Sequence, residues 1–302
     1  MTTSSLPKVL LPQEIFNALS STENVFIPDF KPGASINSFF LAQNELEHKE
    51  IFLCKVVGEK EVRKIYTPPN FNYFGIASKD ARQAAFLNTL SDEEIRVSVC
   101  LGAAGTGKTT LALAYALEQL FNDNKTIYLC KPTHLVGRSK TFGPVPGDQH
   151  EKYAPHLASY EIILKKLTGS EGRYMSLLRD KKKIQFVPVE YMRGNNYEDG
   201  VFILDEVQNF DWHELKTLVS RIAESTKLII IGDPQQIDAR FRYEQSGLYQ
   251  MINSYAFRQS DFTSEITLEK QYRGRIPQLV HDIDMEINKN EGTSTRRNSK
   301  QH

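Results

Sequence analysis

The residues with the most definite chemistry form a glycine-rich stretch, GAAGTGKT at positions 102–109, which matches the pattern GxxxxGK(S/T). Such glycines let the backbone curl so that successive N–H groups face phosphate oxygens. Lys108 would reach the β- and γ-phosphates, and the Thr109 hydroxyl would bind Mg²⁺. The alternative is a turn that only resembles this loop, but an apolar run precedes it and a helical pattern follows. We therefore predict a nucleoside triphosphate site formed by Gly102, Ala103, Ala104, Gly105, Thr106, Gly107, Lys108, Thr109 and Thr110.

Two adjacent acids, Asp205 and Glu206, follow a short apolar run at positions 201–204. We expect Asp205 to hold Mg²⁺ and Glu206 to polarise the attacking water as a general base. An acidic pair after a strand is often only a solvated strand end. The glycine-rich stretch upstream favours the catalytic interpretation.

A third group of polar residues, GDPQQ at positions 232–236, follows the apolar run 227–231. The carboxamide of Gln236 would lie beside the acidic pair, where it could sense the γ-phosphate. GDPQ is also a good turn sequence on its own. Its place after the acidic pair is what makes it informative.

A parallel α/β sheet is the element that would position these residues. Apolar runs at 95–101, 126–131, 184–189, 201–206 and 227–233 predict its strands, and helical patterns lie at 78–90 and after the glycine-rich stretch. Parallel strands place ligands at their carboxyl ends. The fold class is therefore predicted as α/β, with a P-loop and helices flanking the sheet.

The ends of the chain differ from this pattern. The runs EIFLCKVV and EVRKIY flank Gly58-Glu59-Lys60 and predict a β-hairpin within a small accessory unit, residues 1–75. The segment TPPN at 67–70 would break regular structure, so we place the main domain at residues 76–287. The polar composition of residues 288–302 predicts a disordered tail.

Composition excludes few functions. Lys and Arg number 37 together, as do Asp and Glu, so binding to nucleic acid would need a local basic surface. Cys54, Cys100 and Cys130 are odd in number and far apart, which argues against disulfides or a zinc site. We find no secretory signal and no run of about 18 apolar residues, and we expect a cytoplasmic protein that does not act at a membrane.

In this order and spacing the motifs resemble those of a known group. The order of the motifs, GAAGTGKTT, then DEVQ, then GDPQQ, is similar to that in superfamily 1 helicases. Within that superfamily the chain resembles PhoH-like proteins most. FGPVPGD at 142–148 is similar to their GFLPGD segment, EKYAP follows it, and YMRGNNYEDGVFILDEVQN is similar to their stretch from YMRG to DEAQN. LVSRI, GDPQQID and SGL continue the likeness, which spans roughly residues 75–283. The resemblance implies a RecA-like ATPase domain.

The resemblance also implies roles for two further residues. Gln83 is similar to the glutamine that reads the adenine edge, which implies ATP as the nucleotide; without the family, a polar position on a helix surface is the plainer interpretation. Arg273, in LEKQYRGR, resembles the motif IV arginine that contacts the γ-phosphate and stabilises the transition state. PhoH-like sequences more often carry a DVVRH-type segment here, so this chain departs towards the helicase pattern.

The loop after 126–131 corresponds to motif Ia, where helicases grip the nucleic-acid backbone. Basic and hydroxyl side chains without an aromatic ladder predict phosphate tracking on single-stranded RNA or DNA. Ordinary solvated loop charges are the alternative at each position. The candidates are Lys131, Thr133, Arg138, Lys140 and, further along, Arg193.

Superfamily 1 motors bind ATP between two RecA-like lobes, whereas fewer than thirty residues follow Arg273. We therefore expect a homo-oligomer in which a neighbouring subunit supplies the second wall, and the family resemblance implies a hexameric ring. The PIN ribonuclease domain of some PhoH-like proteins is not expected, because residues 1–75 are too few for it.

The leading hypothesis is an ATP hydrolase that binds, moves along or remodels single-stranded nucleic acid. Its catalytic residues would be Lys108, Glu206, Gln236 and Arg273. An alternative is an ATP-gated oligomeric module that acts on a protein partner. A third possibility, a P-loop kinase, is disfavoured because such kinases lack the DEVQ and GDPQQ pair.

Overall fold

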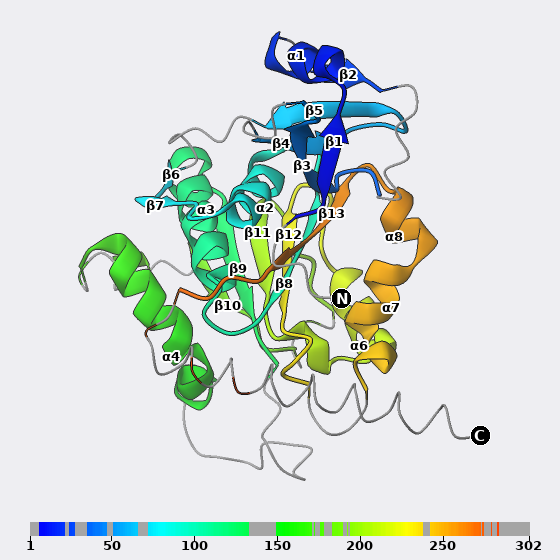
Figure 1. Ribbon diagram of the computed structural model, residues 1–302. Helices are drawn as coiled ribbons and strands as arrows, with labels where there is room; N and C mark the ends of the chain where they lie inside the picture. Colours follow the sequence, from blue (N-terminus) through cyan, green and yellow to red (C-terminus); the bar gives the residue numbers. More distant parts are fainter. Residues whose placement is uncertain are drawn as a thin grey trace.

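A computed structural model describes residues 6–21, 24–27, 35–46, 51–65, 72–132, 149–170, 176–177, 183–189, 194–237 and 242–272, with single positions elsewhere. Its centre is a six-stranded, all-parallel sheet (Figure 1). The strands are β8 (Val97–Gly102), β9 (Thr126–Cys130), β10 (Ile184–Phe186), β11 (Gly200–Leu204), β12 (Lys227–Gly232) and β13 (Thr263–Leu268), in the order β10-β9-β11-β12-β8-β13. The predicted α/β class with a parallel sheet is confirmed.

Helices cover both faces of this sheet (Figure 1). They are α2 (Ala81–Ser91), α3 (Lys108–Asp123), α4 (Gln149–Thr168), α6 (Trp212–Val219), α7 (Gly247–Asn253) and α8 (Tyr255–Gln259). Successive residues of a strand face opposite sides, so Ile203 and Ile229 join a core with α2, α3 and α4. Phe202 and Ile230 join a second core with α6 and α7. Among the described residues, no helix is long and apolar enough to cross a membrane.

The edge strand β13 is the part of the central sheet that the apolar runs did not predict. It pairs in parallel with β8, the strand that leads into the glycine-rich loop. Its sequence TSEITL mixes polar and apolar residues, and the buried hydroxyls of Thr263 and Ser264 donate to the carbonyls of Phe257 and Asn37, at 2.6 and 3.0 Å. The last pair in this register joins Leu268 to Gly102, so β13 directly supports the first residue of the loop.

The amino-terminal part forms a second, mixed sheet of five strands. Its elements are β1 (Lys8–Leu11), α1 (Gln13–Ser21), β2 (Asn24–Phe26), β3 (Phe39–Asn44), β4 (Ile51–Val56) and β5 (Glu61–Ile65), with the strand order β1-β3-β4-β5-β2. The predicted hairpin is present as β4 and β5, which pair antiparallel. The prediction was incomplete, because it lacked α1 and the other three strands. A short hairpin, β6 (Asn72–Tyr73) and β7 (Ile76–Ala77), leads into α2.

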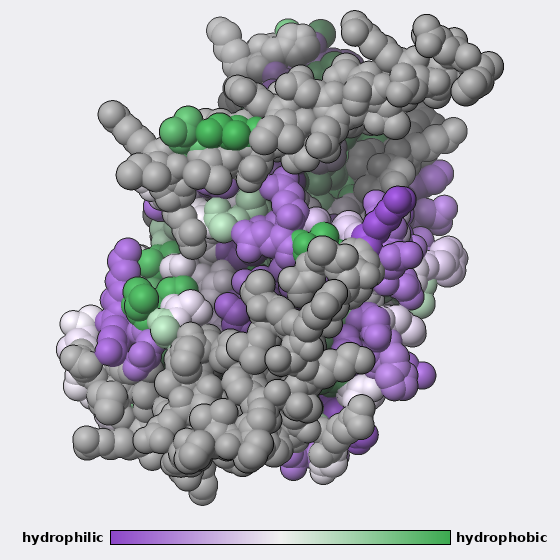
Figure 2. Space-filling model, turned by 90° about the horizontal axis from the view of Figure 1, so that it is seen from below, coloured by the Kyte–Doolittle hydropathy of each residue, from purple (hydrophilic) through white to green (hydrophobic). Residues whose placement is uncertain are grey.

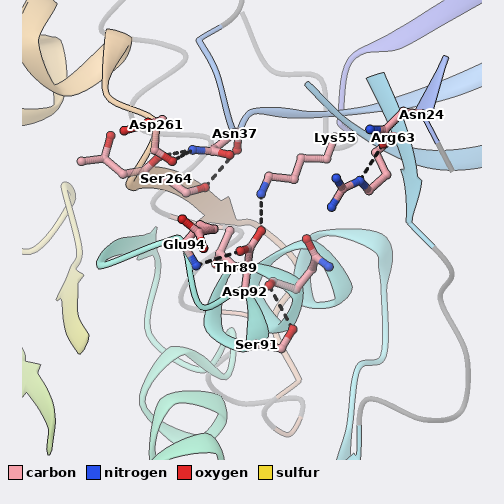
Figure 3. Close-up of polar contacts among 12 residues, drawn as sticks. Asn24, Asn37, Lys55, Arg63, Thr89, Ser91, Asp92, Glu94, Asp261 and Ser264 are labelled. Atoms are coloured by element: carbon pink, nitrogen blue, oxygen red, sulfur yellow. Dashed lines mark hydrogen bonds and ion pairs between the residues drawn. The ribbon is translucent and has the colours of Figure 1, made fainter. Parts of the chain in front are cut away.

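This amino-terminal sheet lies against the amino ends of the central strands (Figures 1 and 3). The Asn37 side chain donates to the carbonyls of Asp261 and Thr263 at the start of β13, at 2.6 and 3.1 Å. Lys55 of β4 donates to Asp92, at the end of α2, at 2.6 Å. Phe39, Leu53 and Ile65 of the same sheet, and Leu6 just before β1, belong to the core formed with α2 and α3. The two sheets therefore share packing, and the domain boundary near residue 75 stays a prediction.

Candidate nucleotide-binding site

A pocket of about 500 Å³ lies at the carboxyl ends of the central strands. Figure 2 views the molecule from this end, and hydrophilic side chains gather in the middle of the face. The walls come from the glycine-rich loop, the start of α2, one face of α4 and the loops after β9, β11 and β12. The predicted residues that line the pocket are Gln83, Ala104, Gly105, Gly107, Lys108, Thr109, Thr110, Lys131, Asp205, Glu206 and Gln236.

The glycine-rich loop joins β8 to α3, as the motif requires. Gly102 has φ 146°, and a Cβ there would lie 2.2 Å from the carbonyl oxygen of Leu268, so only glycine fits. Gly107 has φ 98° and precedes the first residue of α3. The amino end of a sixteen-residue helix, with its unpaired N–H groups and positive dipole, therefore faces the pocket. These features suit a bound phosphate group.

Lys108 lies within this loop. Its Nζ donates to the carbonyl oxygens of Gly102 and Ala103, at 2.5 and 2.9 Å. Thr106, which is fully buried, closes the loop from within by donating its hydroxyl to the Ala103 carbonyl at 2.9 Å. The ammonium group is thus held at the centre of the loop, where phosphate oxygens would be bound.

Asp205, directly after β11, is buried and accepts three hydrogen bonds. Its Oδ1 accepts from the Glu206 N–H at 2.9 Å, and its Oδ2 accepts from the Thr109 hydroxyl at 3.3 Å and from the Tyr160 hydroxyl at 3.2 Å. Burial raises the pKa of Asp205, and the charge of Glu206 raises it further, while Lys131 and Lys108 act in the opposite direction. Burial also raises the pKa of Tyr160 well above its usual value, so its hydroxyl stays protonated and can donate.

The hydroxyl oxygen of Thr109 and the carboxylate oxygens of Asp205 are suitable ligands for a magnesium ion. Mg²⁺ in nucleotide sites is held by one or two protein oxygens together with phosphate oxygens and water. No group of three or more His, Cys, Asp and Glu side chains among the described residues could hold a metal by itself.

Glu206 has an unusual backbone conformation, with φ 58° in the left-handed region. Such a conformation costs about 1–3 kcal/mol for a residue with a side chain, and it persists only where neighbours hold it. One carboxylate oxygen accepts from Gln208 Nε2 at 2.8 Å, and the other lies 3.7 Å from Lys131 Nζ. These two contacts hold the carboxylate at the edge of the pocket.

Gln208, which was not predicted as a site residue, connects the acidic pair to the loop after β12. It is fully buried; its Oε1 accepts from the Asp233 N–H at 3.0 Å, and its Nε2 also donates to the Gln236 carbonyl at 3.2 Å. Burial raises the pKa of Asp233 as well. Its place as the fourth residue of DEVQ is the sequence signal that could have identified it. The second and third predicted motifs are therefore joined by one side chain.

Gln83 is almost fully buried beside the glycine-rich loop, so it is not a surface position of α2. Its Nε2 donates to the Thr106 carbonyl and its Oε1 accepts from the Lys79 N–H, both at 2.9 Å. Nearby, Tyr272 also lines the pocket, with its N–H on the Gly105 carbonyl at 3.0 Å and its hydroxyl on Asp80 at 2.6 Å. Sequence reasoning missed Tyr272, although it directly precedes the predicted Arg273.

Several predicted residues fall outside the described parts of the chain. These are Arg273 and the nucleic-acid candidates Thr133, Arg138, Lys140 and Arg193, as well as the segment FGPVPGD at 142–148. Lys131 is described, and it lies in the nucleotide pocket next to Glu206. Its assignment to nucleic acid stays a prediction.

A phosphate-binding loop between β8 and α3, an acidic pair after β11, and β12 between these two strands define a P-loop nucleotide-binding domain. The sequence pattern of the family described as "PhoH-like protein" matches residues 75–284, and the chain therefore belongs to this family. This confirms the resemblance and its extent. Membership implies nucleotide binding.

Individual relatives agree with this assignment. The chain is 29% identical to Protein PhoH2 of Bacillus subtilis over 93% of its own length and 64% of that protein. It is 32% identical to a PhoH-like protein of Synechocystis over 57% of its length and 51% of that protein. The chain thus spans between about half and two thirds of these relatives. Among solved structures, the crystal structure of Pif1 helicase from Candida albicans is 20% identical, with a TM-score of 0.34, over 68% of this chain and 43% of that chain.

Proposed function

We propose that this chain hydrolyses ATP with Mg²⁺ and that the ATP cycle acts on single-stranded RNA or DNA. The observation that best supports hydrolysis is the meeting of Lys108, Asp205 and Glu206 in one pocket, although they come from distant parts of the sequence. A phosphate-binding cation, a metal-binding carboxylate and a general base are the groups that this reaction needs.

Each residue has a separate part in the proposed reaction. Lys108 would bind the β- and γ-phosphate oxygens and neutralise the charge that develops on them. Mg²⁺, held by Thr109 and Asp205, would supply further positive charge at the same phosphates. Glu206 would accept a proton from the attacking water, and its contact with Gln208 orients the carboxylate for this step.

Preference for adenine would come from Gln83, as the family resemblance implies. Its carboxamide lies between the glycine-rich loop and the start of α2 and lines the pocket. A carboxamide nitrogen carries two protons, so its bond to Thr106 leaves capacity for a second acceptor such as a base nitrogen. A comparison of ATP and GTP hydrolysis would test this assignment.

Coupling to nucleic acid is supported by the likeness to superfamily 1 helicases and by the position of Lys131. This residue follows β9, lies beside Glu206 and begins the segment that carries the other candidate phosphate contacts. The Gln208 link between Glu206 and Gln236 provides a contact through which the γ-phosphate state could reach the loop after β12. A homo-oligomer, with a hexameric ring as the favoured form, would place a neighbouring subunit at the pocket and is part of the same proposal.

The deciding experiment is steady-state ATP hydrolysis with and without single-stranded RNA and DNA. Glu206→Gln should lower turnover about 100-fold or more while nucleotide binding persists, because only the proton acceptor is lost. Glu224→Gln is the matched control, since its side chain is 92% exposed and far from the pocket in the fold. Stimulation by one polymer would support the proposal and name the substrate. Slow turnover that neither polymer changes would overturn nucleic-acid coupling and favour the ATP-gated module with a protein partner.

A further inference from the structure

One fully buried tyrosine of α4 contacts the candidate metal site. Tyr160 has no exposed surface, and its hydroxyl donates to Asp205 Oδ2 at 3.2 Å. The same oxygen accepts from the Thr109 hydroxyl at 3.3 Å. Tyr160 therefore contacts the carboxylate at the atom that faces the other candidate metal ligand.

The hydroxyl of Tyr160 needs a specific explanation, because packing alone does not require it. A phenylalanine ring would fill the same space among the apolar residues of this core, whereas a buried hydroxyl costs free energy unless it is hydrogen-bonded. Its partner is a buried carboxylate, and hydrogen bonds to charged groups are stronger than those between neutral groups. The hydrogen bond therefore acts on the orientation of the Asp205 carboxylate, and the packing of α4 does not need it.

The whole carboxylate of Asp205 is oriented by donors. The Glu206 N–H holds Oδ1 at 2.9 Å, and Tyr160 and Thr109 hold Oδ2. Helix α4 also presents Ser159, Ile163 and Lys166 to the pocket, at the spacing expected of one helix face. Tyr160 itself does not line the pocket; it lies behind this helix face and reaches Asp205 across 45 positions of sequence.

We propose that Tyr160 is a positioning residue that orients Asp205 for Mg²⁺, so that α4 contributes to the affinity for the magnesium–nucleotide complex. This inference rests on the proposed function, because it assigns Asp205 to the metal. Groups that hydrogen-bond a metal-binding carboxylate fix its rotamer and direct its lone pairs, and their loss commonly lowers metal affinity about 10- to 100-fold. Loss of the hydroxyl should therefore weaken binding only when the metal takes part.

The test compares Tyr160→Phe with wild type in equilibrium binding of a fluorescent ATP analogue, once with saturating Mg²⁺ and once with a chelator. With Mg²⁺, Tyr160→Phe should raise Kd about tenfold or more, and with the chelator its Kd should stay within about twofold of wild type. Tyr128→Phe is the matched control: this tyrosine is also buried and donates to a backbone carbonyl, that of Glu198, at 3.0 Å. It should leave both constants unchanged. Thermal melting of each variant reports any loss of the fold.

Two results would overturn the role of Tyr160 and leave the proposed function standing. They are a Tyr160→Phe variant that keeps wild-type affinity with Mg²⁺, and one that loses affinity equally with the chelator. As a second measurement, the Mg²⁺ concentration for half-maximal ATP turnover should rise in this variant and not in Tyr128→Phe. If wild type binds the nucleotide equally well with and without Mg²⁺, the role of Tyr160 in metal-dependent affinity fails. If wild type shows no Mg²⁺-dependent ATP turnover, the proposed function itself fails.

Discussion

Gln208 donates to the carboxylate of Glu206 at 2.8 Å, and this contact joins the proposed general base to the loop after β12. The other end of the same carboxamide accepts from the Asp233 N–H at 3.0 Å. Glu206 has a left-handed backbone, a strained conformation that persists only where neighbouring groups hold the residue in place. The contact between Gln208 and Glu206 therefore both positions the proposed base and connects it to the loop after β12.

Replacing Gln208 with methionine should lower kcat about tenfold or more, because a misplaced base loses much of its catalytic effect. The affinity for the nucleotide should change little, since Gln208 is not among the residues that line the pocket. Steady-state kinetics and equilibrium nucleotide binding would separate the two effects. Gln250→Met provides the control, because Gln250 is exposed on α7. An unchanged kcat in Gln208→Met would contradict the role of the bridge.

The strands of the central sheet were predictable where their apolar runs were unbroken. β11 and β12 are buried along their whole length, so every residue carries the signal. β13 was missed because its buried, hydrogen-bonded residues Thr263 and Ser264 are polar and interrupt the apolar run. In the amino-terminal sheet, the β4–β5 hairpin is a local feature, whereas β1 pairs in parallel with β3 some thirty positions later, and no local pattern indicates that pairing.

The residues of the candidate site also divide into those that the sequence predicted and those that only the fold shows. Lys108, Asp205 and Glu206 belong to short motifs whose chemistry is evident from residue type and spacing. Tyr272 lines the pocket and Tyr160 contacts Asp205 only because the fold brings the end of β13 and α4 to this place. A tyrosine in a helical or irregular stretch carries no sequence signal for such a role, since most such tyrosines serve packing. Tertiary contacts therefore supply what the motifs do not.

Gly102→Ala should destabilise the fold and abolish nucleotide binding. The new Cβ would lie 2.2 Å from the Leu268 carbonyl, and φ 146° is strained for any residue with a side chain. We expect a loss of more than about 1 kcal/mol in the free energy of unfolding. Thermal melting with and without nucleotide would show both effects, with Gly172→Ala as control, because a Cβ there meets no atom within 4 Å. Equal melting curves for Gly102→Ala and wild type would rule out this constraint.

Lys227, at the start of β12, should make stability depend on pH. Its Nζ donates to the carbonyls of Thr89 and Asp92 at 2.7 and 2.8 Å, and burial lowers its pKa from 10.5 to about 7, against the opposing charge of Asp92. Between these two values the unfolded chain binds a proton that the folded protein does not, so this residue's contribution to stability rises with pH. The increase is at most about 1.4 kcal/mol per pH unit.

Urea unfolding of wild type and Lys227→Met at about pH 7 and about pH 9 would measure this contribution. Wild type should gain stability relative to Lys227→Met as the pH rises. Lys216→Met, at an exposed lysine of α6, should follow wild type at both values. If the difference between wild type and Lys227→Met is the same at both pH values, Lys227 does not titrate in this window.

The ion pair of Lys55 with Asp92 should stabilise the contact between the two sheets without affecting the nucleotide. The atoms lie 2.6 Å apart, and the side chains are only 4% and 22% exposed. Removing one partner of a buried pair leaves the other charge uncompensated, so Lys55→Met should lower the free energy of unfolding by about 3 kcal/mol. Nucleotide affinity should stay within about twofold of wild type, because Asp92 lies beside Lys227 at the amino end of β12, whereas the pocket lies at the carboxyl ends of the strands.

The same pair gives a second, pH-dependent expectation. Burial acts to raise the pKa of Asp92, but the hydrogen bond and charge of Lys55, together with the Glu94 N–H and the charge of Lys227, hold the pKa below its usual value. The stabilisation is therefore present above a pH of about 4 and is lost as the pH falls further, so the gap between wild type and Lys55→Met should narrow in acid. Urea unfolding at neutral and acidic pH would measure the gap, with Lys60→Met, at an exposed lysine of the β4–β5 turn, as control. A constant gap would show that Lys55 stabilises the contact by packing and not through the charge of Asp92.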